Sequence, residues 1–245
     1  MRYFGLIGKK LGHSFSAKYF NDKFSKEGIT DAQYDLYEID SIEGLPELLS
    51  ENPDLKAFNV TIPYKEQILP YLHRMDKTVV ETGACNCVKI EDGKLHGFNT
   101  DIHGFMVSIL PLIDVHHHSA LVLGNGGASK AVVYSLEQWS IDVQVVARNP
   151  RAAHELPWNE LTEEMVHEHK IIVNTTPLGM WPDTEACPDI PYAGIDRFHL
   201  CYDLIYNPEK TLFLQKAEAQ DAVIKNGMEM LEQQAERAWE IWMKE

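Results

Sequence analysis

A lysine follows the apolar run 55–60, in the stretch Asn59-Val60-Thr61-Ile62-Pro63-Tyr64-Lys65. The run predicts a buried strand, and Pro63 favours its end because proline fixes its own φ and biases the preceding residue toward extended backbone. Ligands of α/β proteins bind outside the carboxyl ends of the strands, so Lys65 stands where catalytic groups are commonly found. On its position alone, an exposed lysine at the start of a helix is the simpler interpretation.

Asp101 is the carboxylate that we expect to pair with Lys65. The segments 85–90 and 95–98 flank Glu91-Asp92-Gly93-Lys94, and the Asp-Gly pair favours a tight hairpin turn. This hairpin returns the chain to the same edge of the sheet as Lys65. A buried lysine–carboxylate pair beside a reacting carbonyl can share and relay a proton. The alternative role for Asp101 is to cap the helix that follows it.

A second constellation is the glycine-rich stretch Gly124-Asn125-Gly126-Gly127-Ala128, which follows the apolar run 120–123 and precedes a helical pattern. A dinucleotide site requires this order of strand, turn and helix. Gly124 allows the tight turn, Gly126 lets the backbone approach a pyrophosphate, and the helix N-terminus presents N–H groups to the phosphates. Ser129 replaces the third glycine of the usual fingerprint and is small enough for close packing. A purely structural turn is the alternative.

The end of the next predicted strand selects the cofactor. A site that prefers NAD usually places Asp or Glu there, about 20 residues past the glycines, to bind the ribose hydroxyls. This chain has Ala147-Arg148-Asn149-Pro150-Arg151 instead. A guanidinium can hold a 2′-phosphate bidentately, whereas a carboxylate repels it. Arg148 and Arg151 therefore predict NADP as the cofactor, and the alternative is that both are solvated surface charges.

Hydrophobic patterns predict the elements that position these groups. Strands are predicted at 2–8, 33–39, 55–60, 85–90, 95–98, 120–123, 141–147, 171–174 and 200–204. Helices are predicted at 17–27, 42–50, 102–110, 128–139 and 226–244, and the segment 63–82 is predicted as one or two helices interrupted by Pro70. Strands that alternate with helices predict an α/β fold with parallel sheets. We expect a substrate-binding and catalytic domain of residues 1–100 with 210–245, a Rossmann-like dinucleotide domain of residues 101–209, and the active site in the cleft between them.

Composition narrows the class of partner. The chain has 245 residues, 44% hydrophobic, and a formal net charge of −15, which argues against nucleic acid and anionic membranes because both need a basic face. No apolar run approaches the ~20 residues of a membrane span, and the N-terminus lacks the pattern of a signal peptide, so we expect a cytoplasmic protein. The four cysteines have no zinc-finger spacing, so we expect no metal. The expected partner is a small molecule, and the expected state is a monomer or a homodimer.

These motifs together resemble those of the shikimate dehydrogenases, and the resemblance runs through nearly the whole chain. The matched blocks are His13 to Ser16 with Asn21, Asn59 to Lys65, Gly83 to Asn86, Gly97 to Asp101, the loop at Gly124, Asn174 to Met180, Asp203 to Tyr206, and Asn226 to Ala235. Eight blocks in family order make coincidence implausible. The resemblance implies the reversible reduction of 3-dehydroshikimate to shikimate, with NADPH as the hydride donor.

The resemblance also implies roles for individual residues. Lys65 would be the catalytic acid and base, with Asp101 as its partner and a contact to substrate hydroxyls. Further substrate contacts would come from Ser14, Ser16, Thr61, Asn86, Tyr206 and Gln234. Backbone contacts near the nicotinamide would come from Leu204 and Gly227. A small polyhydroxylated acid needs many short polar side chains such as these, because unpaired polar groups are costly once water leaves.

The chain departs from the family pattern at several positions. The family usually has Pro at Ala17, His at Phe20, and Asn-Arg-Thr at Ala147-Arg148-Asn149. Arg148 is kept but the hydrogen-bonding side chains beside it are lost, so selectivity for NADP is expected to be weaker than is usual in the family. The segment between 148 and 171 is also short, so the contacts to the adenine side of the cofactor are expected to differ from the family pattern. Two alternatives follow: a quinate/shikimate dehydrogenase with looser cofactor use, and a catalytically silent ligand sensor. A sensor is expected to lose Lys65 or Asp101, and both are present.

Overall fold

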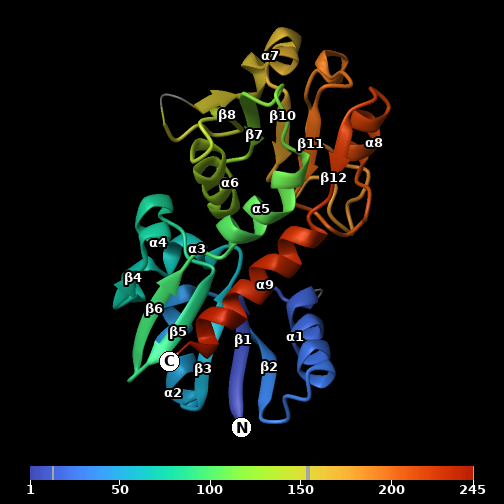
Figure 1. Ribbon diagram of the computed structural model, residues 1–245. Helices are drawn as coiled ribbons and strands as arrows, with labels where there is room; N and C mark the ends of the chain where they lie inside the picture. The colour runs from blue at the N-terminus through green and yellow to red at the C-terminus, as the bar shows by residue number, and fades with distance from the viewer. Residues whose placement is uncertain (13, 153–154, 245) are drawn as a thin grey trace. The chain divides into compact units, whose positions relative to one another are not determined.

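The structure is a computed structural model that describes residues 1–12, 14–152 and 155–244 (Figure 1). The chain forms two compact units, one of Met1–Thr100 with Gln234–Glu245 and one of Asp101–Gln233. Each unit is built around its own six-stranded sheet. Along the part of the chain that the structure describes, no helix has the length and apolar content needed to span a bilayer.

The first unit holds a mixed sheet in the order β2-β1-β3-β5-β6-β4. Its strands are β1 Arg2–Gly8, β2 Ala32–Glu38, β3 Leu55–Val60, β4 Arg74–Met75, β5 Cys87–Glu91 and β6 Lys94–Phe98, and its helices before residue 100 are α1 Phe15–Lys26, α2 Leu45–Glu51, α3 Tyr64–Gln67 and α4 Lys77–Thr82. β1 pairs in parallel with β2 and β3, and β5 and β6 form the predicted antiparallel hairpin. This arrangement brings the ends of β3 and β6 to the two sides of β5.

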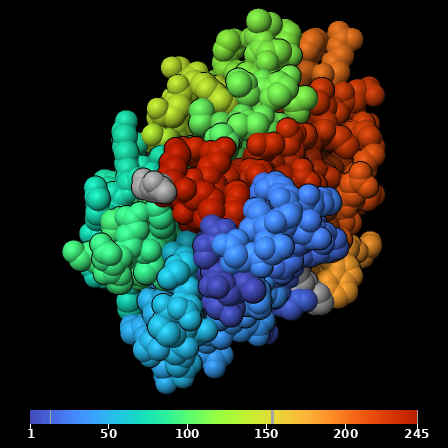
Figure 2. Space-filling model, turned by 60° about the horizontal axis from the view of Figure 1, so that its bottom comes forward, coloured from blue at the N-terminus to red at the C-terminus, as the bar shows by residue number. Residues whose placement is uncertain are grey.

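One face of this sheet is covered by α1 and the C-terminal part of α9 (Met228–Met243). Phe20, which stands where the family usually has His, is fully buried and stacks on Tyr34 with ring centroids 4.4 Å apart. Glu236 of α9 accepts hydrogen bonds from Tyr19 Oη at 2.5 Å and Lys23 Nζ at 2.8 Å. These contacts hold the end of the chain, red in Figure 2, against the blue helix α1.

The second unit holds an entirely parallel sheet in the order β12-β11-β10-β7-β8-β9. Its strands are β7 Ser119–Leu123, β8 Asp142–Ala147, β9 Glu155–Pro157, β10 Ile171–Asn174, β11 Leu200–Asp203 and β12 Val223–Lys225, and its helices include α5 Asp101–Ile109, α6 Gly127–Glu137, α7 Glu163–Glu168 and α8 Leu212–Glu218. In chain order this is the doubly wound arrangement 3-2-1-4-5-6 read from the opposite edge. The α/β fold class with a Rossmann-like unit is therefore confirmed.

The centre of the second sheet is apolar on both faces. All four residues of β10 are buried, and the buried run of β7 alternates between the two core clusters of the unit. Such continuous apolar strands are expected where helices cover both faces of a parallel sheet. The order of strands reverses between β7 and β10, which is where doubly wound sheets bind ligands.

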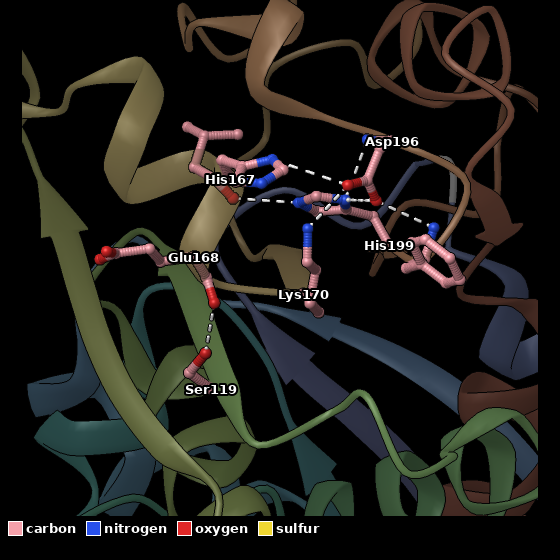
Figure 3. A network of polar contacts seen from close by, with 8 residues as sticks. Ser119, His167, Glu168, Lys170, Asp196 and His199 are labelled. Carbon is pink, nitrogen blue, oxygen red and sulfur yellow. Dashed lines mark hydrogen bonds and ion pairs between the residues drawn. The ribbon is translucent and has the colours of Figure 1, made fainter.

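A polar network holds the amino edge of the second sheet (Figure 3). Asp196 Oδ2 accepts a hydrogen bond from Lys170 Nζ at 2.8 Å, and His199 Nε2 contacts the Val166 carbonyl at 3.0 Å. Burial opposes ionisation of Asp196, but the bonds from Lys170 and the Phe198 backbone hold the pKa of its carboxyl below the usual range. Lys170 and His199 directly precede β10 and β11, so the network fixes the edge opposite to the glycine-rich loop.

Three short strands, β4, β9 and β12, were not predicted from the sequence. The segment 63–82, predicted as one or two helices interrupted by Pro70, forms two helices, α3 and α4, which are separated by a 3₁₀ turn that contains Pro70 and by β4. The prediction that residues 210–233 join the first unit also differs from the structure, which places them in the second. The reason is that β12 pairs with β11, and Phe213 and Leu214 of α8 lie in the core of the second unit.

Candidate active-site residues

Lys65 lies in α3, directly after β3 and the cis peptide Ile62–Pro63. Its carbonyl accepts a hydrogen bond from Cys85 N at 2.8 Å, which ties the short helix to the strand region beside it. The neighbouring Tyr64 is 1% exposed and donates its hydroxyl to the Ile39 carbonyl at 2.6 Å. Two anchors therefore fix the half-buried Lys65 at the carboxyl end of β3.

Asp101 is the first residue of α5 and is buried. It follows Thr100, where the N-terminal segment of the first unit ends, and so begins the second unit. Because Lys65 and Asp101 belong to different units, their pairing stays a prediction.

Asn86 and Gln234, two predicted substrate residues, meet in the first unit. Asn86 Oδ1 accepts a hydrogen bond from Thr100 N at 2.7 Å. Asn86 Nδ2 donates to Thr100 Oγ1 at 3.0 Å and to Gln234 Oε1 at 3.4 Å. Thr100, which is 1% exposed, was not predicted to contribute. It holds the amide of Asn86 in a single orientation.

Ser14 and Ser16 lie at the start of α1. Ser14 is the N-cap, because its side chain accepts a hydrogen bond from Ser16 N at 3.3 Å. Ser16 hydrogen-bonds with Tyr34, whose own hydroxyl donates to Asn59 Oδ1 at 2.9 Å. Asn59 Nδ2 then donates to the Asn86 carbonyl at 3.1 Å. A chain of polar groups thus joins the two predicted substrate-binding regions of the first unit.

This chain of polar groups depends on two residues, Tyr34 and Asn59, that sequence reasoning did not assign to the site. Both are buried, and burial raises the pKa of the Tyr34 hydroxyl well above its usual value, so it stays a neutral donor. Their contacts span 25 and 27 residues of sequence, so no local pattern could have revealed them. His13, part of the block that carried the resemblance, lies outside the described residues.

Thr61 is half-buried at the end of β3, where its N–H donates to the Ile7 carbonyl at 3.0 Å. Its methyl group lies against Gly8 at the end of β1. A Cβ at Gly8 would approach Thr61 Cγ2 to 2.7 Å, so the glycine makes the room for this side chain. Thr61 is thereby held at the same sheet edge as Lys65.

The glycine-rich loop joins β7 to α6 in the second unit. Gly124 has φ +111°, and a Cβ there would lie 2.7 Å from Thr175 Oγ1. Gly126 is the N-cap of α6, and among the described atoms a Cβ at Gly126 would meet no heavy atom within 4 Å. Ser129 is buried, as the packing role predicted for it requires. This cradle at the switch point of the sheet fits the pyrophosphate of a dinucleotide.

The predicted cofactor residues Asn125, Arg148 and Arg151 lie in two neighbouring loops. Asn125 Nδ2 donates to the Asn149 carbonyl at 3.0 Å, and Arg151 Nη1 donates to the Asn125 carbonyl at 3.4 Å. Arg148 and Arg151 are both exposed. The loop after β8 is therefore tied to the glycine-rich loop and carries two guanidinium groups near its surface.

Asn174 and Asp203 form a buried pair at the carboxyl ends of β10 and β11. Asn174 Nδ2 donates to Asp203 Oδ1 at 3.1 Å, and Asn174 Oδ1 accepts from Thr176 N at 3.0 Å. Asp203 Oδ2 accepts from Thr211 Oγ1 at 2.6 Å. Burial raises the pKa of the Asp203 carboxyl to about 6, although these hydrogen bonds oppose the rise. The pair positions the loops after β10 and β11, of which the loop after β10 lies beside Gly124, and the sequence did not reveal this role.

Leu204 and Gly227, the predicted backbone contacts to the nicotinamide, lie against each other. Gly227 N donates to the Ile205 carbonyl at 3.0 Å. A Cβ at Gly227 would lie 2.0 Å from the Leu204 carbonyl oxygen, so only glycine allows this approach. Tyr206 follows in the same loop and is half-buried. The loop after β11 and the residue that precedes α9 are therefore packed directly against each other.

Among the described residues, no group of three or more His, Cys, Asp or Glu side chains is arranged so that it could hold a metal ion. Cys85, Cys87 and Cys201 are buried thiols. Burial raises the pKa of the Cys85 thiol to about 12. A thiol in such surroundings is a packing group rather than a thiolate ligand.

Comparison with known proteins identifies the family. A family model described as the shikimate dehydrogenase substrate binding domain matches residues 6–88. The shikimate dehydrogenase (NADP(+)) of Clostridium beijerinckii is 38% identical over 256 residues, a match that covers 100% of this chain and 93% of the relative. The chain belongs to the shikimate dehydrogenase family. The resemblance drawn from the eight sequence blocks is thereby confirmed.

Solved shikimate dehydrogenases share the fold over the whole chain. The enzyme from Aquifex aeolicus has a TM-score of 0.89 at 35% identity, covering 99% of this chain and 92% of that one. The enzyme from Thermus thermophilus, solved with NADP(H) and shikimate, has a TM-score of 0.88 at 30% identity, covering 99% of this chain and 94% of that one.

Proposed function

We propose that the chain catalyses the reversible, NADPH-dependent reduction of 3-dehydroshikimate to shikimate. The observation that carries this proposal is the full-length similarity to relatives named as NADP(+)-dependent shikimate dehydrogenases. The second unit supports it independently, because its glycine-rich loop lies at the switch point of a doubly wound sheet.

Lys65 is the proposed acid and base. Bound NADPH supplies the hydride chemistry of the reaction. In the direction of reduction, the Lys65 ammonium gives a proton to the oxygen of the ketone, and in oxidation the neutral amine takes it back from the hydroxyl. The anchored backbone of α3 supports this role, since general acid catalysis needs a donor at a fixed position. Asp101 is the proposed partner that orients Lys65 and binds substrate hydroxyls.

The remaining polar groups of the first unit are proposed to hold the substrate. Ser14 and Ser16, at the N-terminus of a 12-residue helix, are suited to its carboxylate because the helix end adds favourable N–H donors. Thr61, Asn86 and Gln234 are suited to its hydroxyls. Tyr206 of the second unit is the last proposed substrate contact.

The second unit is proposed to hold NADP. Gly124 to Ala128 would receive the pyrophosphate, and Leu204 with Gly227 would contact the nicotinamide through their backbone. Arg148 and Arg151 would hold the 2′-phosphate, since a guanidinium offers paired donors that match phosphate oxygens. This assignment predicts that Arg148→Ala lowers kcat/KM for NADP and leaves that for NAD nearly unchanged.

Steady-state kinetics with two substrates and two cofactors tests the proposed function. Shikimate and quinate are each combined with NADP and with NAD, and absorbance of the reduced nicotinamide is followed. The proposal expects the highest kcat/KM for shikimate with NADP. Preferred turnover of quinate with NAD would instead indicate a quinate/shikimate dehydrogenase with looser cofactor use. Saturable shikimate binding without turnover would indicate a ligand sensor.

The cytoplasmic location and the monomeric or dimeric state expected from the sequence belong to the same proposal. Cell fractionation tests the first, and light scattering of the purified protein tests the second.

A further inference from the structure

The connection between β8 and β9 is unusually short for two parallel strands. Only residues 148–154 separate Ala147 from Glu155, and the described part, 148–152, contains no helix. A parallel crossover normally takes a dozen or more residues and usually includes a helix. In this chain β9 pairs with the last three residues of β8, so its first residue, Glu155, lies near the carboxyl edge of the sheet.

The carboxylate of Glu155 joins two loops that sequence reasoning assigned to the cofactor. Glu155 Oε2 accepts a hydrogen bond from Asn125 Nδ2 at 2.8 Å and from Arg151 N at 2.7 Å. Asn125 belongs to the glycine-rich loop and Arg151 to the loop after β8. Doubly wound folds bind the adenosine half of a dinucleotide beside these two loops. The Glu155 carboxylate, an anion of the protein itself, thus accepts hydrogen bonds where the adenosine half would bind.

This carboxylate affects the two cofactors differently. A 2′-phosphate carries close to two negative charges, so Glu155 opposes the attraction that Arg148 and Arg151 exert on it. The amide of Asn125 and the N–H of Arg151 already donate to Glu155, and their hydrogen bonds would have to be shared or exchanged. A ribose 2′-hydroxyl, in contrast, can donate to a carboxylate.

We propose that Glu155 is a specificity-determining residue that reduces the preference of this chain for NADP over NAD. The inference depends on the proposed function in one respect, namely that NADP and NAD are the cofactors that this site distinguishes. The short crossover between β8 and β9 accounts for the position of Glu155, because it brings the start of β9 close to the loop after β8, where the ribose would bind. The segment 147–151 contains no acidic residue, and Glu155 is the first one that follows Arg148 and Arg151 in the sequence.

Binding calorimetry with fragments of the cofactor tests the proposal without any turnover. The probes are adenosine 2′,5′-bisphosphate and ADP, which differ in where they carry their second phosphate and leave out the nicotinamide. The test variant is Glu155→Gln, since a glutamine oxygen can accept the same two hydrogen bonds and only the charge is lost. The control is Asp142→Asn, which removes one charge at the exposed start of β8, at the opposite edge of the sheet.

The proposal expects Glu155→Gln to bind the bisphosphate about 10-fold more tightly, with ADP changing less than about 2-fold, and expects high salt to reduce the difference. Asp142→Asn should change neither affinity by more than about 2-fold. Equal changes for both probes, no change for either, or weaker binding of the bisphosphate would each overturn the proposal. These outcomes do not depend on shikimate turnover by the unmodified protein, so failure of the proposed function would be seen separately.

Discussion

The side-chain oxygen of Asn86 accepts a hydrogen bond from the backbone N–H of Thr100 at 2.7 Å. This bond fixes which end of the Asn86 amide faces Gln234, because the nitrogen must point away from the N–H of Thr100. The Thr100 hydroxyl accepts from that nitrogen at 3.0 Å and secures the orientation. A substrate hydroxyl would therefore meet a donor and an acceptor at defined places.

Replacing the Thr100 hydroxyl should weaken substrate binding as well as lower the stability of the fold. Thr100→Val keeps the volume and the backbone N–H that donates to Asn86 Oδ1, but it removes the hydroxyl that accepts from Asn86 Nδ2. We therefore expect about 1–2 kcal/mol lower stability and a several-fold higher KM for shikimate. Steady-state kinetics and urea unfolding measure the two effects. Thr30→Val, an exposed position in the same unit, is the matched control. Lower stability with an unchanged KM would limit Thr100 to a structural role.

Gly124 and Gly126 should respond differently to the same substitution. Gly124→Ala places a Cβ at φ +111° and 2.7 Å from Thr175 Oγ1, so we expect a lower melting temperature. Gly126→Ala has φ −85°, and its Cβ would point into open space among the described atoms, so the fold should persist. NADP binding should nevertheless weaken at least about 10-fold, because the methyl group would stand where a pyrophosphate approaches.

Differential scanning fluorimetry and calorimetric titration with NADP separate these two outcomes. Gly44→Ala, whose nearest contact would be 3.9 Å from Ile39 Cβ, controls for a harmless methyl group. Unchanged NADP affinity in a folded Gly126→Ala variant would remove this loop from the cofactor site.

Asp203 should make stability depend on pH in the direction opposite to most carboxylates. Its pKa is raised from 3.8 to about 6 by burial, so the folded protein binds a proton more tightly than the unfolded chain does. A raised carboxyl pKa adds stability at low pH that is lost as pH rises through the window between the two values. The difference amounts to about 3 kcal/mol, since each pKa unit corresponds to about 1.4 kcal/mol.

The variant Asp203→Asn removes this titration and keeps the hydrogen bonds, because the Thr211 hydroxyl can accept from the new amide. We expect the stability of the unmodified protein, relative to this variant, to fall as pH rises from about 4 to about 7. Urea unfolding midpoints across that range measure the difference, with Asp142→Asn as an exposed control. A difference that does not vary with pH would show that Asp203 does not titrate there.

The sequence predicted the long apolar elements well and the short edge strands poorly. β3 and β10 have the predicted bounds, since each is a short, mostly apolar run that ends at turn-forming residues. β4 has only two residues, and β9 contains Pro157 at the edge of its sheet. Strands of this kind are stabilised by pairing with a neighbour, which no local pattern shows.

The candidate site was predicted in its parts but not in its connections. Asn86 and Gln234 were both assigned to substrate, yet their contact spans 148 residues and depends on Thr100, which was assigned no role. Glu155 was missed for the same reason, because its partner Asn125 lies 30 residues earlier. Local patterns identify the type of residue, whereas the positions of its partners come from packing.

The central claim is that Lys65 transfers the proton when shikimate is oxidised with NADP. The most direct test is the initial rate of NADPH formation from shikimate by the unmodified protein and by Lys65→Met. Lys56→Met, at an exposed position of β3, is the matched control. We predict that Lys65→Met lowers kcat about 10³-fold or more while shikimate still binds, and that the control is unaffected. A Lys65→Met variant that keeps its rate would contradict the account.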